Sequence, residues 1–380
     1  MKLKRLLSTI VYSVLIRSIK CRRPRNSVAE NSITVLFMAA LGDFLVFCDA
    51  AKELHGCGYK IRLICHEGGG IPESASISGL FDEIVPISKR YSARIKNICM
   101  LRKMETQFAF AAPLGRHILP DIYLMALRAN KRIVPNTMLD CDSKHLKQKI
   151  DRRADQVIEL TATHERARYE GFLREASFIR NDLLPFKFFS EPVKNRGKYI
   201  EVFPGAGGGK EKCWPPKRYA EVVLKLLEYQ DAEVLILGTQ NDVEYANELQ
   251  SRLGNDVNVR NLCGTTTMVQ LRDLLRSARI VLANDSGAAH MSIACNVPTV
   301  VVAGGWQYGR FYPDAALKAS HRAVMVCPEQ LPCIPCGKSR PDCTNGTNAA
   351  PCVLQFKVDE VFETAVQCME NYELSIGVAI

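Results

Sequence analysis

The chain has 380 residues, which exceeds one ordinary hydrophobic core and falls in the two-domain range. Hydrophobic residues make up 47% and charged residues 24% of the sequence, as is normal for a soluble globular protein. No stretch reaches the roughly 18 to 20 apolar residues that a membrane-spanning helix needs. These values exclude a single-core protein and a membrane-spanning one, and they predict a soluble body.

The net charge of +10 is concentrated at the start of the chain. Residues 1–30 carry +7, because eight lysines and arginines face only Glu30. Residues 6–16 between the basic clusters place apolar side chains on one helical face, as in a helix that lies on anionic lipid. We expect residues 1–28 to bind the anionic inner face of the cytoplasmic membrane, so that a cytoplasmic protein is peripherally attached. A solvated basic arm and a signal or anchor segment are the alternatives, and nucleic acid is not expected because only Tyr12 can stack on a base.

The N-terminal part of the chain after this arm alternates β-rich runs with helical patterns. Strands are expected at Ile33–Phe37, Ile61–Cys65 and Glu83–Ile87, with a helix over about 44–56 and basic helical stretches within 91–190. Strands that alternate with helices form a mostly parallel sheet covered on both faces. Residues 31–190 are therefore expected to form a Rossmann-like domain.

A linker rich in Pro, Lys and Asn, from Pro185 to Gly197, precedes a second alternation that fills residues 191–380. Its expected strands are Tyr199–Phe203, Glu233–Leu237, Arg279–Ala283 and Pro298–Val302. Helices are expected at 216–229, at 268–277 and from about Ser286 onward. A last helix is expected to bury Val358, Val361, Phe362, Ala365, Val366 and Met369. A doubly wound half of this kind binds its ligand beyond the carboxyl ends of its strands. The predicted architecture is α/β, with two Rossmann-like domains in tandem.

The most informative segment is Asn284-Asp285-Ser286-Gly287-Ala288-Ala289-His290, which follows a strand and opens a helix. Such a helix start presents unpaired backbone N–H groups and a partial positive charge, which favour a phosphate. Gly287 lets the backbone approach a ligand closely, Ser286 adds a hydroxyl, and His290 lies one turn inside. Alternatively, Asp285 or Ser286 only caps the helix and His290 is a packed polar residue.

A second segment, Phe203 to Pro215, runs from a strand through a glycine-rich loop to a helix that starts with proline. It is not a Walker A loop, because no Gly-Lys-Ser/Thr opens the helix directly. The backbone from Gly205 onward can still cradle a phosphate, and Lys212 can supply a point charge. A flexible surface loop with solvated lysines is the alternative.

A third segment, Ala39-Ala40-Leu41-Gly42-Asp43, makes a strand-to-helix turn in the first domain. A carboxylate at this place, facing an interdomain cleft, can take a proton from a hydroxyl group. Aspartate is also a common helix cap, and for Asp43 by itself the cap is the better interpretation.

Together the three segments resemble glycosyltransferase family 9, which includes the heptosyltransferases of the lipopolysaccharide inner core. The resemblance covers roughly residues 33–370 and rests on the order of Gly42-Asp43, Pro204-Gly205-Ala206 with Lys212-x-Trp214-Pro215, and Asp285-Ser286-Gly287-x-x-His290. It implies a GT-B fold, in which two Rossmann-like, doubly wound domains face a cleft. The first domain then binds the acceptor and the second binds a nucleotide sugar.

The resemblance also implies a role for each site residue. Asp43 matches the general base, and Lys212 matches the lysine that contacts the donor diphosphate. The donor-site motif falls on Asp285, Ser286, Gly287 and His290, with Gly205 in the facing loop. Family members generally invert the anomeric carbon without an active-site metal, so no cofactor is expected beyond the nucleotide-sugar donor, for which an ADP-sugar is favoured. The implied acceptor is a lipid-linked saccharide of the lipopolysaccharide type.

Three places depart from the family pattern. The usual glycine is missing at Ala39 and Ala40, a proline is missing near Cys48–Asp49, and Gly304-Gly305-Trp306 replaces the common Gly-Pro-Thr. The last of these loops, which continues through Gln307 to Arg310, is expected to meet the nucleotide or sugar of the donor. A nucleotide-sugar epimerase or hydrolase of GT-B fold and a non-catalytic nucleotide-sugar-binding protein are the alternative functions.

The 15 cysteines are scattered and odd in number, which suits a reducing cytoplasm better than a disulfide framework. Cys48, Cys65 and Cys295 have apolar neighbours and are expected to be buried. The exception is a cysteine-rich loop, 327–352, that holds Cys333, Cys336, Cys343 and Cys352. Four thiolates can bind a structural zinc ion, and redox-variable thiols or no special role are the alternatives.

Overall fold

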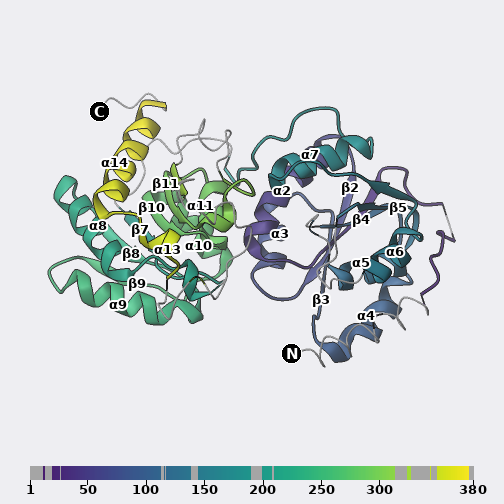
Figure 1. Ribbon diagram of the computed structural model, residues 1–380, viewed down its shortest axis with the longest axis horizontal. Helices are drawn as coiled ribbons and strands as arrows, with labels where there is room; N and C mark the ends of the chain where they lie inside the picture. The colour runs from purple at the N-terminus through teal and green to yellow at the C-terminus, as the bar shows by residue number, and fades with distance from the viewer. Residues whose placement is uncertain are drawn as a thin grey trace. The chain divides into compact units, whose positions relative to one another are not determined.

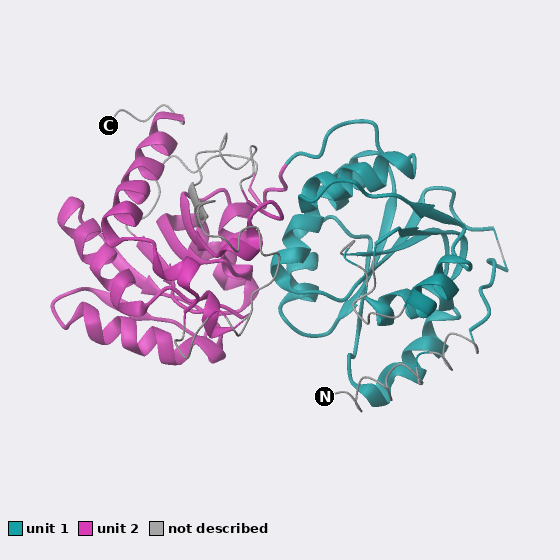
Figure 2. Ribbon diagram, in the orientation of Figure 1, with its two compact units in different colours: residues 1–184 teal, residues 185–380 magenta. Residues whose placement is uncertain are grey.

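The structure is a computed structural model in which the chain forms two compact units (Figure 1). Unit 1 is Met1–Leu184 and unit 2 is Pro185–Ile380 (Figure 2). The described residues are Tyr12 and the ranges 19–25, 27–112, 115, 117–137, 144–189, 199–207, 209–312, 323–326, 343 and 349–375. Within these ranges, no helix is both long enough and apolar enough to cross a membrane.

Unit 1 is built on a six-stranded parallel sheet with the order β3-β2-β1-β4-β5-β6. The strands are β1 (Ser32–Phe37), β2 (Lys60–His66), β3 (Glu83–Ile87), β4 (Glu105–Ala112), β5 (Arg128–Pro135) and β6 (Gln156–Ile158). The helices are α2 (Leu41–Gly56), α3 (Ile71–Ser78), α4 (Arg94–Leu101), α5 (Ile118–Ala126), α6 (Lys144–Asp151) and α7 (Glu165–Glu175), with a 3-10 turn η1 (Tyr91–Ala93) before α4. Five of the six residues of β1 are buried, as expected for a central strand covered on both faces.

The two faces of this sheet have different cores. Helices α2 and α7 pack together on one face, where Phe47 stacks on Phe37 and also contacts Tyr169. Helices α4, α5 and α6 share the opposite core with Leu36, Ile64 and Ala109 of the sheet. Helices on both faces bury the apolar side chains of the central strands, and this burial stabilises the all-parallel sheet.

Unit 2 repeats the plan, with the strand order β12-β11-β10-β7-β8-β9. The strands are β7 (Tyr199–Phe203), β8 (Glu233–Ile236), β9 (Val259–Asn261), β10 (Ala278–Asn284), β11 (Thr299–Ala303) and β12 (Ala323–Val326). The helices are α8 (Pro216–Tyr229), α9 (Val243–Leu253), α10 (Met268–Ser277), α11 (Gly287–Ala294), α13 (Pro351–Leu354) and α14 (Val358–Ser375), with 3-10 turns η2 (Lys210–Lys212), η3 (Gln240–Asp242) and η4 (Gly305–Gln307). Helices α8, α9 and α14 share one core against the sheet, and α10 packs on α11.

Both units therefore have the doubly wound strand order. In this order, the second and third strands are added on one side of the first strand, and the later strands are added on its other side. The change of side lies between β1 and β4 in unit 1 and between β7 and β10 in unit 2. At such a switch point the loops that follow the two strands diverge, and the carboxyl edge of the sheet is open to a ligand. The α/β prediction and both Rossmann-like halves are confirmed.

Every strand expected from the sequence is present, with ends that differ by at most one residue. The region 91–190, expected to hold basic helical stretches, also contains three strands, and the interval 238–261 contains α9 and β9. Most of the predicted linker, from 190 to 197, lies outside the described residues.

Candidate active site

The side chain of Asn284 joins three segments at the switch point of unit 2. Asn284 ends β10, is fully buried, and donates from Nδ2 to the carbonyl of Pro204 over 2.8 Å. Its Oδ1 accepts from the backbone N–H of Trp214 (2.8 Å) and from the hydroxyl of Tyr219 (3.0 Å). One buried amide thus binds the glycine-rich loop, the turn before α8 and α8 itself, and it fixes the chain two residues after Lys212.

Lys212 and Asp285 form a buried ion pair next to Asn284. The Lys212 Nζ lies 3.0 Å from Oδ2 of Asp285, and the two side chains are 17% and 3% exposed. Burial by itself raises the pKa of Asp285, but the Lys212 ammonium, His290 and a hydrogen bond from Gln307 outweigh it and lower the pKa. Asp285 is therefore an anion that holds an ammonium group at the carboxyl edge of the sheet.

The helix that follows Asp285 begins as the sequence predicts. Ser286 has an extended backbone and is the N-cap of α11, with its Oγ accepting from the N–H of Ala289 at 3.4 Å. Ser286 and Gly287 are half-buried, so the first turn of α11 is partly accessible to solvent. An accessible helix start carries a partial positive charge, and Lys212 adds a full one beside it. The cap interpretation of Ser286 is correct, and it leaves the anion-binding interpretation intact.

His290 lies one turn inside α11 and is 8% exposed. Its ring meets Phe311 edge-on at 5.3 Å and lies nearly parallel to Tyr312 at 6.1 Å. The imidazole is near enough to Asp285 to contribute to the low pKa of that carboxyl. His290 thus supports the charged pair from within an aromatic environment.

Gly205 is needed for a reason that the sequence did not show. A Cβ at this position would lie 2.0 Å from Oδ1 of Asp242, a carboxylate that caps the turn η3. Asp242 is held there because its Oδ2 accepts from both the N–H and the hydroxyl of Thr239, at 2.8 and 2.7 Å. Only glycine lets the loop after β7 pass this carboxylate, so Gly205 shapes the loop that carries Lys212.

Gln307, which was not among the predicted site residues, completes the network. Its Nε2 donates to Oδ2 of Asp285 over 2.6 Å, so the amide and Lys212 bind the same oxygen. The Lys212 Nζ also lies 5.7 Å from the centre of the Trp306 ring, which rests against Gly304. The available signal was the departure of Gly304-Gly305-Trp306 from the family pattern, which pointed to this loop but not to this residue.

In unit 1, Asp43 lies in the first turn of α2, directly after β1 at the switch point. It is half-buried, and the N-cap of α2 is Ala40, so the cap interpretation of Asp43 is wrong in detail. A carboxylate in the first turn still complements the positive end of the helix. Asp43 thus stands at the place in unit 1 that corresponds to the Lys212–Asp285 pair in unit 2.

His66 at the end of β2 fixes the loop before Asp43, and sequence reasoning missed it. Its Nε2 lies 2.9 Å from the carbonyl of Ala39, and its Nδ1 accepts from the N–H of Gly68 at 3.2 Å. Burial lowers the pKa of His66, which favours the neutral ring that can donate at Nε2 and accept at Nδ1 together.

The cysteine-rich loop 327–352 is only partly described. Cys333 and Cys336 lie outside the described residues, whereas Cys343 is half-buried and Cys352 is buried. In the part of the chain that the structure describes, no group of three or more His, Cys, Asp or Glu could hold a metal ion, so nothing supports the predicted zinc site. Cys48, Cys65 and Cys295 are buried, as expected, and burial raises the pKa of Cys65 to about 12.

Two doubly wound units in tandem, with an ion pair and a helix start at the switch point of the second, have the architecture of the GT-B fold. The chain belongs to glycosyltransferase family 9: the model described as "Glycosyltransferase family 9 (heptosyltransferase)" matches residues 138–343, which is more than half of the chain.

Two similar proteins that are named as heptosyltransferases agree with this family assignment. The chain is 33% identical over 129 residues to lipopolysaccharide heptosyltransferase 2 of Escherichia coli, covering 33% of this chain and 35% of that protein. It is 29% identical over 220 residues to lipooligosaccharide heptosyltransferase 2 of Campylobacter jejuni, covering 56% of this chain and 66% of that protein. The matched segments thus span from about a third to just under two thirds of these relatives.

Solved structures show the same fold over nearly the whole chain. The E. coli ADP-heptose lipopolysaccharide heptosyltransferase II superimposes with a TM-score of 0.68 at 20% identity, over 90% of this chain and 99% of that one. A family 9 glycosyltransferase from Veillonella parvula gives 0.68 at 16% identity, over 92% and 100%. The predicted GT-B fold class is confirmed.

Proposed function

We propose that this protein is an inverting glycosyltransferase that moves a heptose from a nucleotide-linked donor to a lipopolysaccharide-type acceptor. One observation carries the proposal: the Lys212 ammonium lies 3.0 Å from Asp285, beside the start of α11, at the switch point of a doubly wound sheet. Family membership and the names of the relatives support heptosyl transfer. A structural neighbour described as a heptosyltransferase with ADP supports an ADP-linked donor.

The charges of unit 2 suit the departure of a nucleoside diphosphate. As the bond between the sugar and the diphosphate breaks, negative charge grows on the phosphate oxygens. The Lys212 ammonium and the N-terminus of α11, which starts at Ser286 and Gly287, are fixed groups that stabilise this charge. Asp285 holds Lys212 until the diphosphate becomes the partner of this lysine, and Gln307 continues to donate a hydrogen bond to the buried carboxylate. Unit 2 thereby binds and activates the donor.

Asp43 in unit 1 serves as the general base. The oxygen of an acceptor hydroxyl attacks the anomeric carbon from the side opposite the diphosphate, and its proton passes to the Asp43 carboxylate. The bond to the diphosphate oxygen breaks in the same step, so a single in-line displacement inverts the anomeric carbon. His66 fixes the backbone of the loop that leads to Asp43, which keeps the base in place for this step.

The substitution Asp43→Asn tests this assignment. We expect kcat for transfer to fall by roughly 10²- to 10⁴-fold, the usual contribution of a general base, while the affinity for the donor stays within about twofold. Asp182→Asn is the matched control, since Asp182 has an 80% exposed side chain in the same unit. Full transfer by Asp43→Asn would show that another group accepts the proton.

The alternative functions give different outcomes with the same proteins. A nucleotide-sugar hydrolase or epimerase consumes the donor without any acceptor, and a non-catalytic binding protein shows no turnover at all. A thermal-shift screen against ADP-, GDP-, UDP- and dTDP-sugars identifies the nucleotide, because a ligand that binds only the folded state raises its melting temperature. We expect stabilisation by the ADP-sugar and little by the others.

A lipid-linked acceptor requires the enzyme at a membrane. We place the protein in the cytoplasm at the inner face of the cytoplasmic membrane, with the basic residues 1–28 in contact with anionic lipid. Of these residues only Tyr12, 19–25, 27 and 28 are described, so the apolar face of residues 6–16 stays a prediction from sequence.

A further inference from the structure

Helix α4 and the turn η1 before it form an unusually basic segment of unit 1. Residues 88–104 contain no aspartate or glutamate and six basic residues: Lys89, Arg90, Arg94, Lys96, Arg102 and Lys103. The helix buries Asn97, Ile98 and Leu101 against the core. On the outer side, Tyr91 of η1 and Ile95 of α4 are 58% and 70% exposed, and the Arg94 guanidinium lies 4.0 Å from the centre of the Tyr91 ring. The segment therefore presents two large apolar side chains within a ring of positive charge.

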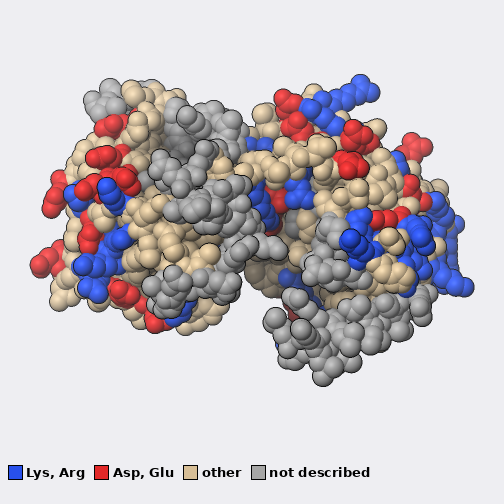
Figure 3. Space-filling model, in the orientation of Figure 1, with Lys and Arg blue, Asp and Glu red and all other residues tan. Residues whose placement is uncertain are grey.

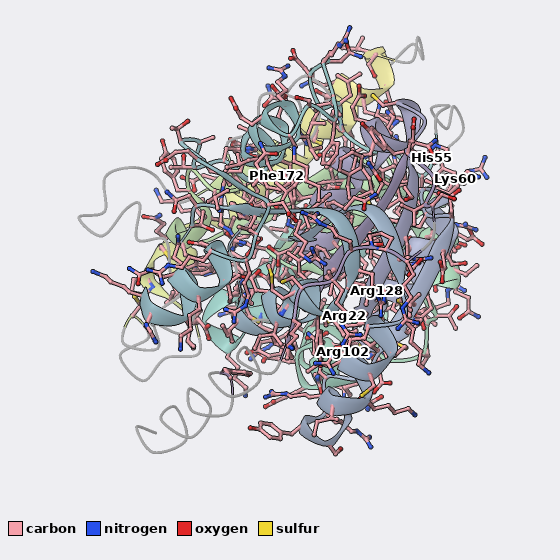
Figure 4. The ribbon with its side chains drawn as sticks, turned by 90° about the vertical axis from the view of Figure 1, so that its right-hand side faces the viewer. Arg22, His55, Lys60, Arg102, Arg128 and Phe172 are labelled. Atoms are coloured by element: carbon pink, nitrogen blue, oxygen red, sulfur yellow. The ribbon has the colours of Figure 1, made fainter. Side chains whose placement is uncertain are left out.

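Tyr12 and residues 19–25 lie beside this helix. At the start of α4, the Arg94 guanidinium lies 5.3 Å from the Tyr12 ring. At its end, Arg128 donates to the carbonyl of Arg102 over 2.8 Å and to that of Arg23 over 3.4 Å. Figure 4 shows Arg22, Arg102 and Arg128 lying together. The basic N-terminal segment and α4 are thus neighbouring parts of one surface.

This contact belongs to the folded unit rather than to a loose tail. Ile19 is 2% exposed and shares a core cluster with Ile98 and Leu101 of α4. The Arg132 side chain donates to the carbonyls of Arg22 and Leu127, both over 2.6 Å. Residues 19–25 therefore have a defined position, which holds their positive charges next to those of α4.

Positive charge exceeds negative charge on this surface. Asp155 pairs with Arg23 at 2.7 Å, and Glu105 accepts from the backbone N–H of Arg25 at 2.9 Å. A third carboxylate, Glu67, accepts from the hydroxyl of Ser88 at 2.8 Å. These three carboxylates do not balance the exposed basic residues around them, which are Lys20, Arg22, Arg23, Arg25, Lys89, Arg90, Lys96 and Lys103. Figure 3 shows Lys and Arg side chains gathered along the right-hand edge of unit 1, which is not the part of the unit in which Figure 1 labels α4.

We propose that α4, η1 and residues 19–25 together form a membrane-binding surface, the α4 surface, that rests on anionic phospholipid headgroups. Clustered lysines and arginines are attracted to the negative potential of such a layer, and exposed Tyr and Ile side chains insert at its boundary. A protein partner is less suited, because the apolar part consists of two residues and is surrounded by charge of one sign. This inference is independent of the transfer reaction, and it extends lipid contact from residues 1–28 to η1 and α4.

The α4 surface extends along unit 1 from one edge of the sheet to the other. The turn η1 follows β3, so Lys89, Arg90 and Tyr91 lie at the carboxyl edge of the sheet, the edge at which Asp43 follows β1. The other end of the surface lies at the amino edge, where Arg25 contacts Glu105 at the start of β4 and Arg102 contacts Arg128 at the start of β5.

Sedimentation of the full-length protein with vesicles tests the proposal. We expect the wild type to bind vesicles of phosphatidylcholine with about a third phosphatidylglycerol, to bind pure phosphatidylcholine weakly, and to be released by salt. Lys96→Glu with Lys103→Glu should lower binding to the anionic vesicles by about tenfold or more. Tyr91→Ser with Ile95→Ser should lower it several-fold and leave the salt dependence unchanged. Lys217→Glu with Lys225→Glu on α8 of unit 2 is the matched charge control and should bind like the wild type.

The outcome is decisive in either direction when folding is checked by the melting temperature and by ADP binding, neither of which the α4 variants should change. Equal vesicle binding by the wild type and both α4 variants would overturn the proposal. It would also be overturned if the variants slowed transfer to a short, lipid-free acceptor as much as they weakened vesicle binding, since the surface would then bind the saccharide. Deletion of residues 1–28 is an unsuitable test, because it removes the buried Ile19 together with the charges.

Discussion

The two units have the same strand order, but their switch points are built differently. In unit 2, Asn284 joins three segments, and Lys212 and Gln307 both bind Asp285. In unit 1, the described contact at the corresponding place is between His66 and the backbone of the loop before Asp43. Side chains thus cross-link the site in unit 2, whereas in unit 1 a side chain fixes the backbone and Asp43 extends from it.

This difference matches the chemistry proposed for each half. A diphosphate carries several charges, and fixed charges that need no rearrangement stabilise it best. An acceptor hydroxyl is neutral, and it needs one carboxylate at the correct distance and angle. Under the proposed function, the same doubly wound frame holds an electrostatic site in one unit and a proton-accepting site in the other.

The largest effect on stability should come from removing the buried amide of unit 2. Asn284→Ala leaves the N–H of Trp214, the hydroxyl of Tyr219 and the carbonyl of Pro204 without their partner, and each buried unsatisfied group costs about 1–3 kcal/mol. We expect the free energy of unfolding to fall by about 3 kcal/mol or more in urea denaturation. Asn255→Ala, at an exposed position, is the control, and its free energy of unfolding should stay within about 0.5 kcal/mol of the wild-type value. A similar loss in both variants would mean that Asn284 does not organise the site.

A smaller loss should follow from adding one methyl group at Gly205. Gly205→Ala places a carbon 2.0 Å from the Asp242 carboxylate, so the loop or η3 must move, at a cost of about 1–3 kcal/mol. Because the moved loop carries Lys212, donor affinity should fall as well. Gly207→Ala is the matched control, since nothing lies within 4 Å of a Cβ there. Thermal melting and donor titration of the two variants test the comparison, and equal behaviour would contradict it.

The smallest effect should come from Gln307→Leu. Loss of one hydrogen bond to Asp285 should weaken donor binding by about three- to tenfold at neutral pH. The pKa of Asp285 should also rise, since the bond from Gln307 is one of the influences that lower it. A depressed carboxyl pKa means that the ionised form is lost only in acid, so the variant should lose donor affinity at a higher pH than the wild type does. Gln250→Leu, an exposed site, should show the wild-type profile, and an unshifted acid limb in Gln307→Leu would contradict this role.

The sequence predicted the central strands and the order of the site motifs because both depend on local patterns. Apolar runs such as Ile33–Phe37 indicate buried strands, and a strand followed by Ser286-Gly287 indicates a helix start. The resemblance placed Lys212 and the segment Asp285–His290 at one donor site, but the direct ion pair between Lys212 and Asp285 was not predicted. These relations need no knowledge of how distant side chains pack.

The remaining features depend on contacts between distant residues. Arg132, with its side chain 2% exposed, lies in a strand whose charges resemble a surface pattern. Its bonds to the carbonyls of Arg22, Leu127 and Ala129 and to the carboxylate of Asp155 explain the burial. Asp242 restricts Gly205 from another turn, and Gln307 reaches Asp285 from 22 residues away. A single sequence carries no signal for such pairs, so the strands of 91–190 and the role of Gln307 were not predicted.

Calorimetric titration of ADP and AMP into the wild type, Lys212→Ala and Lys210→Ala tests the central claim most directly. Lys210 is a matched control because it lies in the same turn with its side chain 57% exposed. We predict that Lys212→Ala loses ADP affinity by roughly 10- to 150-fold, corresponding to about 1.5–3 kcal/mol for a charge-assisted hydrogen bond, and that it loses much less affinity for AMP, which has no β-phosphate. Lys210→Ala should bind ADP within about twofold of the wild type. Unchanged ADP affinity in Lys212→Ala, or an equal loss in both lysine variants, would contradict a diphosphate site between Lys212 and the start of α11.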